Sequence, residues 1–531
     1  MTDKGRKKRR RRIFVVVLVA AVLLGVYLSI YRPPSGPIRI TISRETTHIL
    51  GPVNEDGTVN YVAYLNAKHS KGVTTENNAA IPLIEIFGPD LLPKDTDGEI
   101  YKILKIEPPA EDGKYFVALD DYIEKTLSNE DAEAWEDEHD LDKVTTKPWK
   151  PKQYPVIAEW LKANDDALDA MPVAMQRTDY YMPTGSLGPD ESMVSLSLPN
   201  VRSCLDMGNA LAARAMLKLD SGDAPGAWVD LMSARHLARR VGSGYSLIES
   251  LVAIAIETTA CSGCRAMAGS EKLTDTQARA FLIDMQRLGP LPDLVDTIDK
   301  AERFFMLDCV MMLARATYQG GLVGLRDALD NMDGTGEQQA DPPTTAPRGG
   351  SLEWDKILLK MNPWYDSFVA AARQRTFKTR TEALAAHDLR SEELSVSVYK
   401  SRSFLHSVLK HFRDPTDEIG DILVSLLLPS ISRTVVLRDR GTVEGDLSVV
   451  AMALAVYRAE KKAYPDKLSE LAPGYLKKVP DDLFIDKPFG YKQTEKGYLL
   501  YSVGKNMKYD GEKKKEDDED GEKDDIVVRV E

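Results

Sequence analysis

The sequence predicts a mainly helical protein with an N-terminal transmembrane helix, a body of helical hairpins and a small α+β module at the C-terminus. Three observations predict this fold class. Residues 13–31 form an uncharged apolar run. Residues 199–288 carry apolar and small side chains at helical spacing. Residues 441–531 begin with a helical pattern and then change to the alternating pattern of strands.

The apolar run IFVVVLVAAVLLGVYLSIY occupies residues 13–31 and, as an α-helix, would be about 28 Å long, close to the hydrocarbon thickness of a bilayer. Residues 1–12 contain eight Lys or Arg and one acid, so the positive-inside rule keeps this end in the cytoplasm and exports the rest. A cleaved signal peptide is the alternative. The run is longer than a normal signal-peptide core and LSIYRPP offers no small-x-small cleavage site, so we expect an uncleaved single-pass anchor.

The net charge of the chain is −13, and residues 1–12 contribute +7, which leaves −20 on the exported part. This acidic body argues against a nucleic-acid partner and against lying flat on anionic lipid. Four cysteines in 531 residues are too few for a disulfide framework.

The N-terminal exported region has mixed composition. One helix is expected after Gly57, and a second is expected to begin near Thr75, whose hydroxyl group suits an N-cap. Glu-x-x-His occurs twice in the chain, first as Glu45 with His48. Because neither copy lies on an apolar bundle helix, we expect solvated polar segments rather than a carboxylate-bridged metal site.

The central region contains two helices joined by DSGDAPG, and small residues such as Ala210 and Ala234 permit close helix packing. This hairpin is similar to one tetratricopeptide unit. A third helix places Glu249 and Glu257 eight residues apart on an otherwise apolar element. The two carboxylates are either acid/base groups with raised pKa values or partners of basic residues on the preceding helix. We favour ion pairing with the basic residues Arg235, His236, Arg239 or Arg240.

Cys261 and Cys264 form a C-x-x-C pair at the end of the third helix. A redox pair of the thioredoxin type would follow a strand, and a haem-attachment motif would include a histidine. Neither feature is present in the sequence, so we expect these cysteines to be small packing residues.

Residues 331–351 contain almost no side chains that a core would bury and are expected to form a flexible linker. The expected parts, in order, are a basic cytoplasmic segment (1–12), a transmembrane helix (13–31), a mixed exported region (38–198), a helical domain (199–330), the linker (331–351), a helical region (352–440) and an α+β module with an acidic loop (441–531).

The α+β module carries a specific set of residues around its expected strands at Tyr491, at Tyr498 to Val503 and at Ile526 to Val530. They are Ala453, Leu454, Tyr457, Tyr464, Pro465, Leu468, Leu471, Tyr475, Leu476, Pro480, Asp481, Pro488, Gly490, Tyr491, Tyr501, Ser502, Gly504, Asn506, Asp525 and Ile526. On these residues the module resembles the globular part of the major pseudopilin of type II secretion systems, which are bacterial. The resemblance covers residues 444–530 at most.

The resemblance implies a calcium site, because the corresponding loop of that family holds calcium through carboxylate and carbonyl oxygens. Asn506 stands where the family has an aspartate, Asp510 lies in the glycine-containing turn, and Asp525 corresponds to the terminal ligand. The loop is lengthened by EKKKEDDEDGEK at residues 512–523, whose acids either supply ligands or keep the loop solvated. Residues 13–31 contain no glutamate, so we do not expect processing as a pilin.

The sequence contains no Walker loop, G-x-G-x-x-G, G-x-S-x-G or H-E-x-x-H motif. We therefore expect a non-catalytic scaffold or assembly factor in the bacterial inner membrane, with an envelope protein as partner and a role near a secretion or pilus machine. The alternative is a membrane-anchored enzyme with a carboxylate site at Glu249 and Glu257.

Overall fold

A computed structural model describes residues 38–127, 141–188, 191–196, 198–270, 273–332, 352–408, 416, 420–421, 423–424, 431–511 and 524–531, apart from the side chains of 319–332, 395 and 397–408. The expected transmembrane helix at 13–31, most of the expected linker and the loop insertion at 512–523 lie outside these residues.

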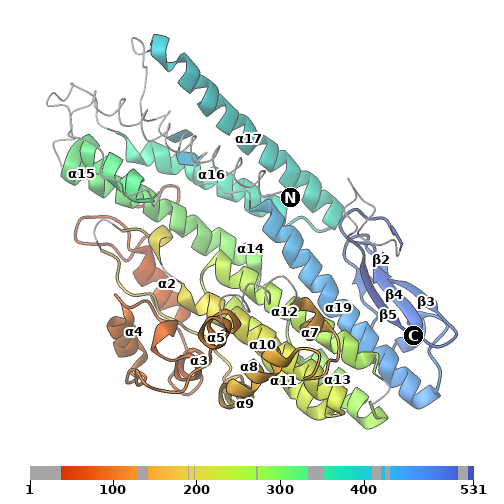
Figure 1. Cartoon of the computed structure of the whole chain (residues 1–531). Coiled ribbons are helices and arrows are strands. Elements are labelled where there is room, and N and C mark those ends of the chain that lie inside the picture. Colours follow the sequence, from red (N-terminus) through yellow and green to blue (C-terminus); the bar gives the residue numbers. More distant parts are fainter. Residues whose placement is uncertain are drawn as a thin grey trace.

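The protein is mainly helical with a small sheet part at the C-terminus, as the sequence predicts (Figure 1). The first helices are α2 (Tyr61–His69), α3 (Ala80–Phe87), α4 (Asp97–Leu104), α5 (Leu119–Thr126), α7 (Leu141–Thr146), α8 (Pro155–Ala163), α9 (Asp165–Ala174), α10 (Pro199–Ser221), α11 (Ala224–Gly242) and α12 (Leu247–Ala268). The later helices are α13 (Asp275–Arg287), α14 (Leu294–Thr297), the π-helical turn η3 (Ile298–Glu302), α15 (Arg303–Met332), α16 (Trp354–Ala372), α17 (Phe377–Val408) and α19 (Ser432–Lys461).

The second helix of the N-terminal region, α3, begins at Ala80, later than the expected start near Thr75. The side chain of Asn78 explains the difference. Its Oδ1 accepts the N–H groups of Ala80 and Tyr181 at 3.1 and 2.8 Å, and its Nδ2 donates to the carbonyl of Tyr181 at 2.8 Å. The residues before Ala80 are thus held by a distant segment of the chain, while the hydroxyl of Thr75 donates to Glu76.

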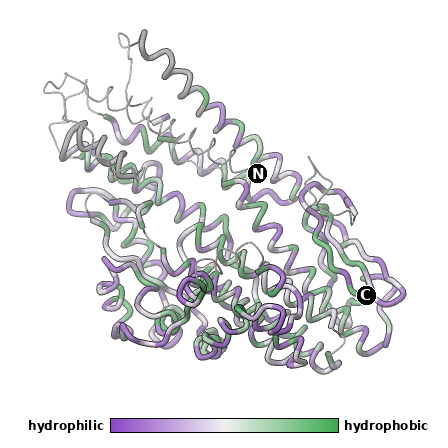
Figure 2. Tube along the Cα trace, viewed as in Figure 1, coloured by the Kyte–Doolittle hydropathy of each residue, from purple (hydrophilic) through white to green (hydrophobic). Residues whose placement is uncertain are grey.

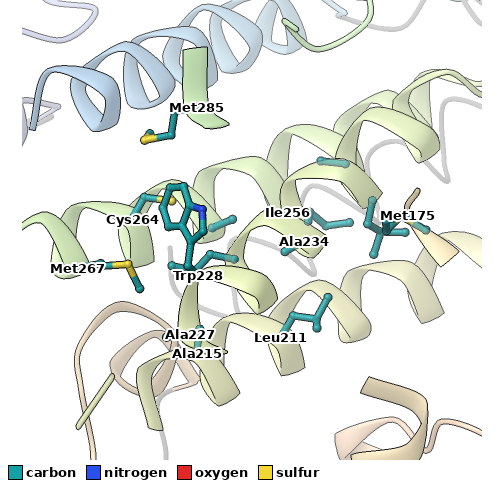
Figure 3. Close-up of a cluster of buried hydrophobic side chains, with 14 of the residues drawn as sticks. Met175, Leu211, Ala215, Ala227, Trp228, Ala234, Ile256, Cys264, Met267 and Met285 are labelled. Atoms are coloured by element: carbon teal, nitrogen blue, oxygen red, sulfur yellow. The ribbon is translucent and has the colours of Figure 1, made fainter. Parts of the chain in front are cut away.

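The central helices α10, α11 and α12 pack against one another and form the hairpins that the sequence predicts. Gly222 adopts φ = 92° and ends α10, because a left-handed conformation is accessible to glycine without steric cost. Asp223 then caps α11 by accepting the N–H of Gly226 at 2.9 Å. Figure 3 shows part of the resulting core around Trp228 of α11. The ring of Trp228 stacks on that of Phe281 of α13 with the centroids 4.4 Å apart.

The buried apolar side chains form two clusters. One contains α3–α5, α7–α13, the second half of α19 and the C-terminal strands, and the other contains α2, α14–α16 and the start of α19, while α17 contributes to both. Figure 2 shows hydrophobic and hydrophilic positions mixed along the helices, as amphipathic helices require. Val435 of α19 belongs to one cluster and Val443 to the other, so the boundary expected at residue 441 falls inside one continuous helix.

The C-terminal strands form a three-stranded antiparallel sheet in the order β3 (Gly490–Gln493), β4 (Tyr498–Ser502) and β5 (Ile526–Val530), close to the expected strands. A separate short pair joins β1 (Asp481–Asp482) to β2 (Lys487–Pro488). Alternate residues of β4 and β5 are buried, and both strands contact α19. Figure 1 shows the sheet beside the C-terminal half of that helix.

Candidate functional site

Glu257 lies at the centre of a buried ion-pair cluster. Its Oε1 lies 2.7 Å from Nη2 of Arg235, and its Oε2 lies 2.7 Å from Nη1 of Arg239. Burial alone would raise the pKa of Glu257, but the charges of Arg235 and Arg239 outweigh burial and lower it to about 2. Glu257 is therefore an ionised structural partner of α11, and the expected pairing with basic residues of the preceding helix is present.

Glu249 has a different structural role, at the start of α12. Its Oε2 accepts the backbone N–H of Ser246 at 3.0 Å, and the hydroxyl of Ser246 accepts the N–H of Glu249 at 3.1 Å. This reciprocal arrangement is a capping box. Burial raises the pKa of Glu249. Glu249 and Glu257 thus bind different partners, since Glu249 caps the start of α12 and Glu257 pairs with arginines of α11.

The four cysteines are free and buried. Cys261 and Cys264 lie inside α12, where burial raises both thiol pKa values, that of Cys264 to about 11. A thiol needs a lowered pKa and access to solvent for redox chemistry. Both side chains are fully buried, and Figure 3 shows Cys264 among the apolar side chains of α11 and α12.

Among the described residues, α12 is the helix long and apolar enough to cross a membrane, but 61% of its apolar window is buried in the body. Core helices of soluble proteins meet the same criteria. Its two buried carboxylates and its packing against α10, α11 and α19 assign α12 to the core.

A cluster of three carboxylates lies at the end of the C-terminal sheet. One oxygen each from Asp510, Asp524 and Asp525 lies within 4.8 Å of the others. The N–H of Asp510 donates to Oδ2 of Asp525 at 3.0 Å, and the N–H of Asn506 donates to Oδ2 of Asp524 at 2.9 Å. The fold thus joins the loop after β4 to the two residues before β5.

Gly504 permits this close approach. It adopts φ = 66°, and a Cβ atom at this position would lie 2.4 Å from the carbonyl oxygen of Asp524. Any larger residue would therefore push the segment before β5 away from the loop after β4. Oδ1 of Asp524 and Oδ1 of Asp525 are buried and have no hydrogen-bond partner. Burial raises the pKa of Asp525, and the carboxylates of Asp510 and Asp524 raise it further.

Two of the three residues expected to bind calcium, Asp510 and Asp525, are brought together in this cluster. The third, Asn506, uses its side chain within the loop, since its Oδ1 accepts the N–H of Lys508 at 2.8 Å and its Nδ2 donates to Asp510 at 2.5 Å. Asp524 takes its place in the cluster. Sequence reasoning missed Asp524, although the adjacent acids Asp524 and Asp525 before a strand were a visible signal.

The donor set of this cluster fits a hard divalent cation. Calcium binds six to eight oxygen atoms, mostly from carboxylates and carbonyls. Asp510, Asp524 and Asp525 supply carboxylate oxygens, and the two buried oxygens without partners have the chemistry that a cation would satisfy.

Glu45 and His48 of the first Glu-x-x-His motif line a second feature, a pocket of about 450 Å³. Arg303 is part of the same lining and is ion-paired with Asp299 at 2.7 Å and with Asp366 at 2.8 Å. Burial lowers the pKa of His48, and the nearby charge of Arg303 lowers it further. In the described part of the chain, these side chains do not form a cluster of three metal-ligating groups. The second motif, at residues 136–139, lies outside the described residues.

Comparisons of the chain with known protein families, with curated proteins and with solved structures give no match.

Proposed function

We propose that this chain is a membrane-anchored, non-catalytic scaffold that holds its C-terminal module for binding or assembly with another envelope protein. The observation that carries the proposal is the continuity of α19. Its first turns pack in the cluster that contains α15 and α16, and its later turns pack against α12, α13 and the sheet. One helix therefore fixes the module to both cores of the body.

Arg380 of α17 reinforces this attachment, because it forms a buried ion pair with Asp439 of α19 at 2.7 Å. Phe377, at the start of α17, contacts the ring of Phe484 in the module at a centroid distance of 4.7 Å. A module on a flexible tether would bury few such contacts. These contacts support a module with a fixed orientation.

The position of the chain that leaves the proposed anchor supports a module directed away from the membrane. The seven residues from 32 to 38 span at most about 25 Å. Thr41 then binds Asp355 at the start of α16 through its N–H at 2.8 Å and its hydroxyl at 2.7 Å. The helix α16 is about 28 Å long. Its C-terminal end, Ala372, lies five residues before Phe377, which contacts Phe484 of the module.

The topology is tested by fusing alkaline phosphatase and, separately, green fluorescent protein behind Glu531. We expect an active phosphatase and a dark fluorescent protein, because the first folds only after export and the second only in the cytosol. A control without residues 1–31 should show the reverse pattern. Fluorescence from the full chain would overturn the proposed anchor and orientation.

The binding role is tested by photo-crosslinking in membranes. A photoreactive residue replaces Tyr509 on the module and, as a control, the more exposed Val173 on the body. We expect a discrete crosslinked envelope protein from position 509 that position 173 does not produce. Identical products from both positions, or none from position 509, would contradict a binding role for the module.

We also propose that the module binds calcium at Asp510, Asp524 and Asp525. A free calcium concentration 100 times the dissociation constant would raise the free energy of unfolding by about 2.7 kcal/mol. Millimolar calcium should therefore raise the melting temperature of the chelator-treated full chain in detergent, and magnesium should act more weakly because it demands stricter octahedral geometry.

The matched variants for this test are Asp525→Asn, which should abolish the calcium effect, and Glu495→Gln, which removes the same charge from an exposed position elsewhere in the module. Calorimetric titration provides the affinity of each protein. No heat and no melting shift in the unsubstituted chain would exclude calcium, and an equal loss in both variants would show a general effect of charge.

A further inference from the structure

A pocket of about 420 Å³ lies between α2, the segment 181–188 and α15. Its lining is mainly polar and includes Asn60, which caps α2, Asn66 of α2, and Asp308 and Arg315 of α15. The volume is within the range of small-molecule sites. Neither the proposed anchor nor the C-terminal module involves this pocket.

Arg315 is the unusual group of this lining. Its Nη1 and Nη2 reach the hydroxyl of Thr58 and the carbonyl of Glu191, each at 3.4 Å, which is long for a hydrogen bond. Its Nε is buried and has no hydrogen-bond partner, and no ion pair to Arg315 forms within the described part of the chain. Arg303, on the same helix, shows the usual arrangement, with carboxylates of Asp299 and Asp366 at 2.7 and 2.8 Å.

The acidic groups of the pocket are committed to other partners. Glu99 accepts the N–H of Ser186 at 2.8 Å and its hydroxyl at 2.7 Å. Asp308 lies two helical turns before Arg315, and its Oδ2 accepts the N–H of Met193 at 2.8 Å. Among the residues that the structure describes, no carboxylate therefore forms an ion pair with the guanidinium of Arg315, although Asp308 is near enough for the charge of Arg315 to act on it.

The amide side chains of α2 are also occupied. Asn66 donates to the carbonyl of Thr184 at 2.8 Å and accepts its N–H at 3.0 Å. Asn60 accepts the N–H of Ala63 at 2.8 Å. These two side chains are thus held by short hydrogen bonds of their own, whereas the two hydrogen bonds of Arg315 are long.

We propose that this pocket binds a small oxyanion, a carboxylate or a phosphate group, through the guanidinium of Arg315. A guanidinium presents paired N–H donors that match the two oxygens of such a group, and a charge-assisted pair is stronger than the present contacts to a hydroxyl and a carbonyl. The bound oxyanion would supply a counter-charge to this partly buried guanidinium. The acids Glu99 and Asp308 disfavour further negative charges, so the rest of the ligand is neutral and polar.

The proposal is tested by calorimetric titration and thermal melting of the full chain in detergent. Sodium acetate is the carboxylate probe, inorganic phosphate is the phosphate probe, and sodium chloride at equal ionic strength is the reference. We expect at least one of the two probes to bind and to raise the melting temperature above the chloride reference. Binding of acetate alone would identify the ligand as a carboxylate, and binding of phosphate alone would identify it as a phosphate.

The variant Arg315→Gln should lower the affinity for the bound probe at least tenfold. Arg279→Gln is the matched control, because Arg279 is an ion-paired arginine far from the pocket. Arg315→Lys retains the charge without the paired donors and should show intermediate affinity; it also serves if the Gln variant does not fold. No binding of either probe, or equal affinity in the Arg315 and Arg279 variants, would overturn the proposal.

Discussion

Replacement of Glu257 by Gln separates a structural role from a catalytic role for the buried carboxylates of α12. Glu257 is the carboxylate partner of both Arg235 and Arg239, whose side chains are 4% and 12% exposed. The neutral amide of Gln is nearly the same size, so the change removes the charge and keeps the packing. Two guanidinium groups would then remain in the core without a counter-charge.

The size of the effect follows from this geometry. Breaking a buried ion pair by removing one partner costs about 3–5 kcal/mol, because the remaining charge has lost water without gaining a partner. The loss should be at the upper end of this range, since Glu257 neutralises two cations. Glu249→Gln is the matched control. The amide oxygen of Gln can still accept the N–H of Ser246, so we expect a loss of at most about 1 kcal/mol, the typical value of a cap.

The measurement is urea denaturation of the full chain in detergent, followed by circular dichroism at 222 nm because most of the signal comes from helices. The midpoint should fall strongly for Glu257→Gln and slightly for Glu249→Gln. Adding Arg239→Gln to Glu257→Gln should recover part of the loss, since one uncompensated charge is removed. Equal midpoints for the unsubstituted chain and for Glu257→Gln, together with loss of a measurable turnover, would refute the structural interpretation.

Three further predictions concern the same helical body. Gly208→Ala on α10 should lower the free energy of unfolding by about 1 kcal/mol, because the added Cβ would lie 2.9 Å from two atoms of Ile256. In Gly445→Ala on α19, the added Cβ meets no atom within 4 Å, so this variant should be neutral or stabilising. The melting temperatures of the two variants test this difference. Iodoacetamide at pH 8 should label Cys261 and Cys264 only after denaturation, and mass spectrometry would detect the opposite result. The pKa of Glu257 is about 2 in the folded chain and 4.5 for an ordinary glutamate, so its stabilising contribution is complete above about pH 4.5 and is lost as the pH falls towards 2. The unsubstituted chain should therefore lose more stability between pH 5 and pH 2 than Glu257→Gln does.

The helices and strands that have local signals could be predicted from the sequence. The α10–α11 hairpin follows from helical spacing and from the Gly222–Asp223 turn, and the box of Ser246 and Glu249 starts α12. The strands β4 and β5 follow from short runs rich in aromatic and β-branched residues. Each of these signals lies within a few residues of the element that it specifies.

Other features depend on contacts between residues far apart in the sequence and could not be predicted. The start of α3 is set by Asn78 and Tyr181, which are 103 residues apart. The position of Asp524 in the carboxylate cluster depends on the close backbone approach at Gly504. The boundary expected at residue 441 marks the start of the α+β module, but α19 runs through this position without a break while the core that it packs against changes.

The sequence predicts that Glu257 pairs with a basic residue, since a charge in an apolar helix requires a counter-charge nearby. Which of the four candidate basic residues would reach it was not, because this depends on the rotation of α11 against α12. The structure selects Arg235 and Arg239, which are one helical turn apart and face the same side.

The continuity of α19 has a mechanical consequence. A force applied to the β-sheet is transmitted along this helix of 30 residues, which packs in two separate hydrophobic clusters. Displacement of the sheet therefore disturbs the packing of both clusters. Backbone amides in the middle of this helix should be among the slowest of the molecule to exchange with deuterium, because their exposure requires the whole body to open.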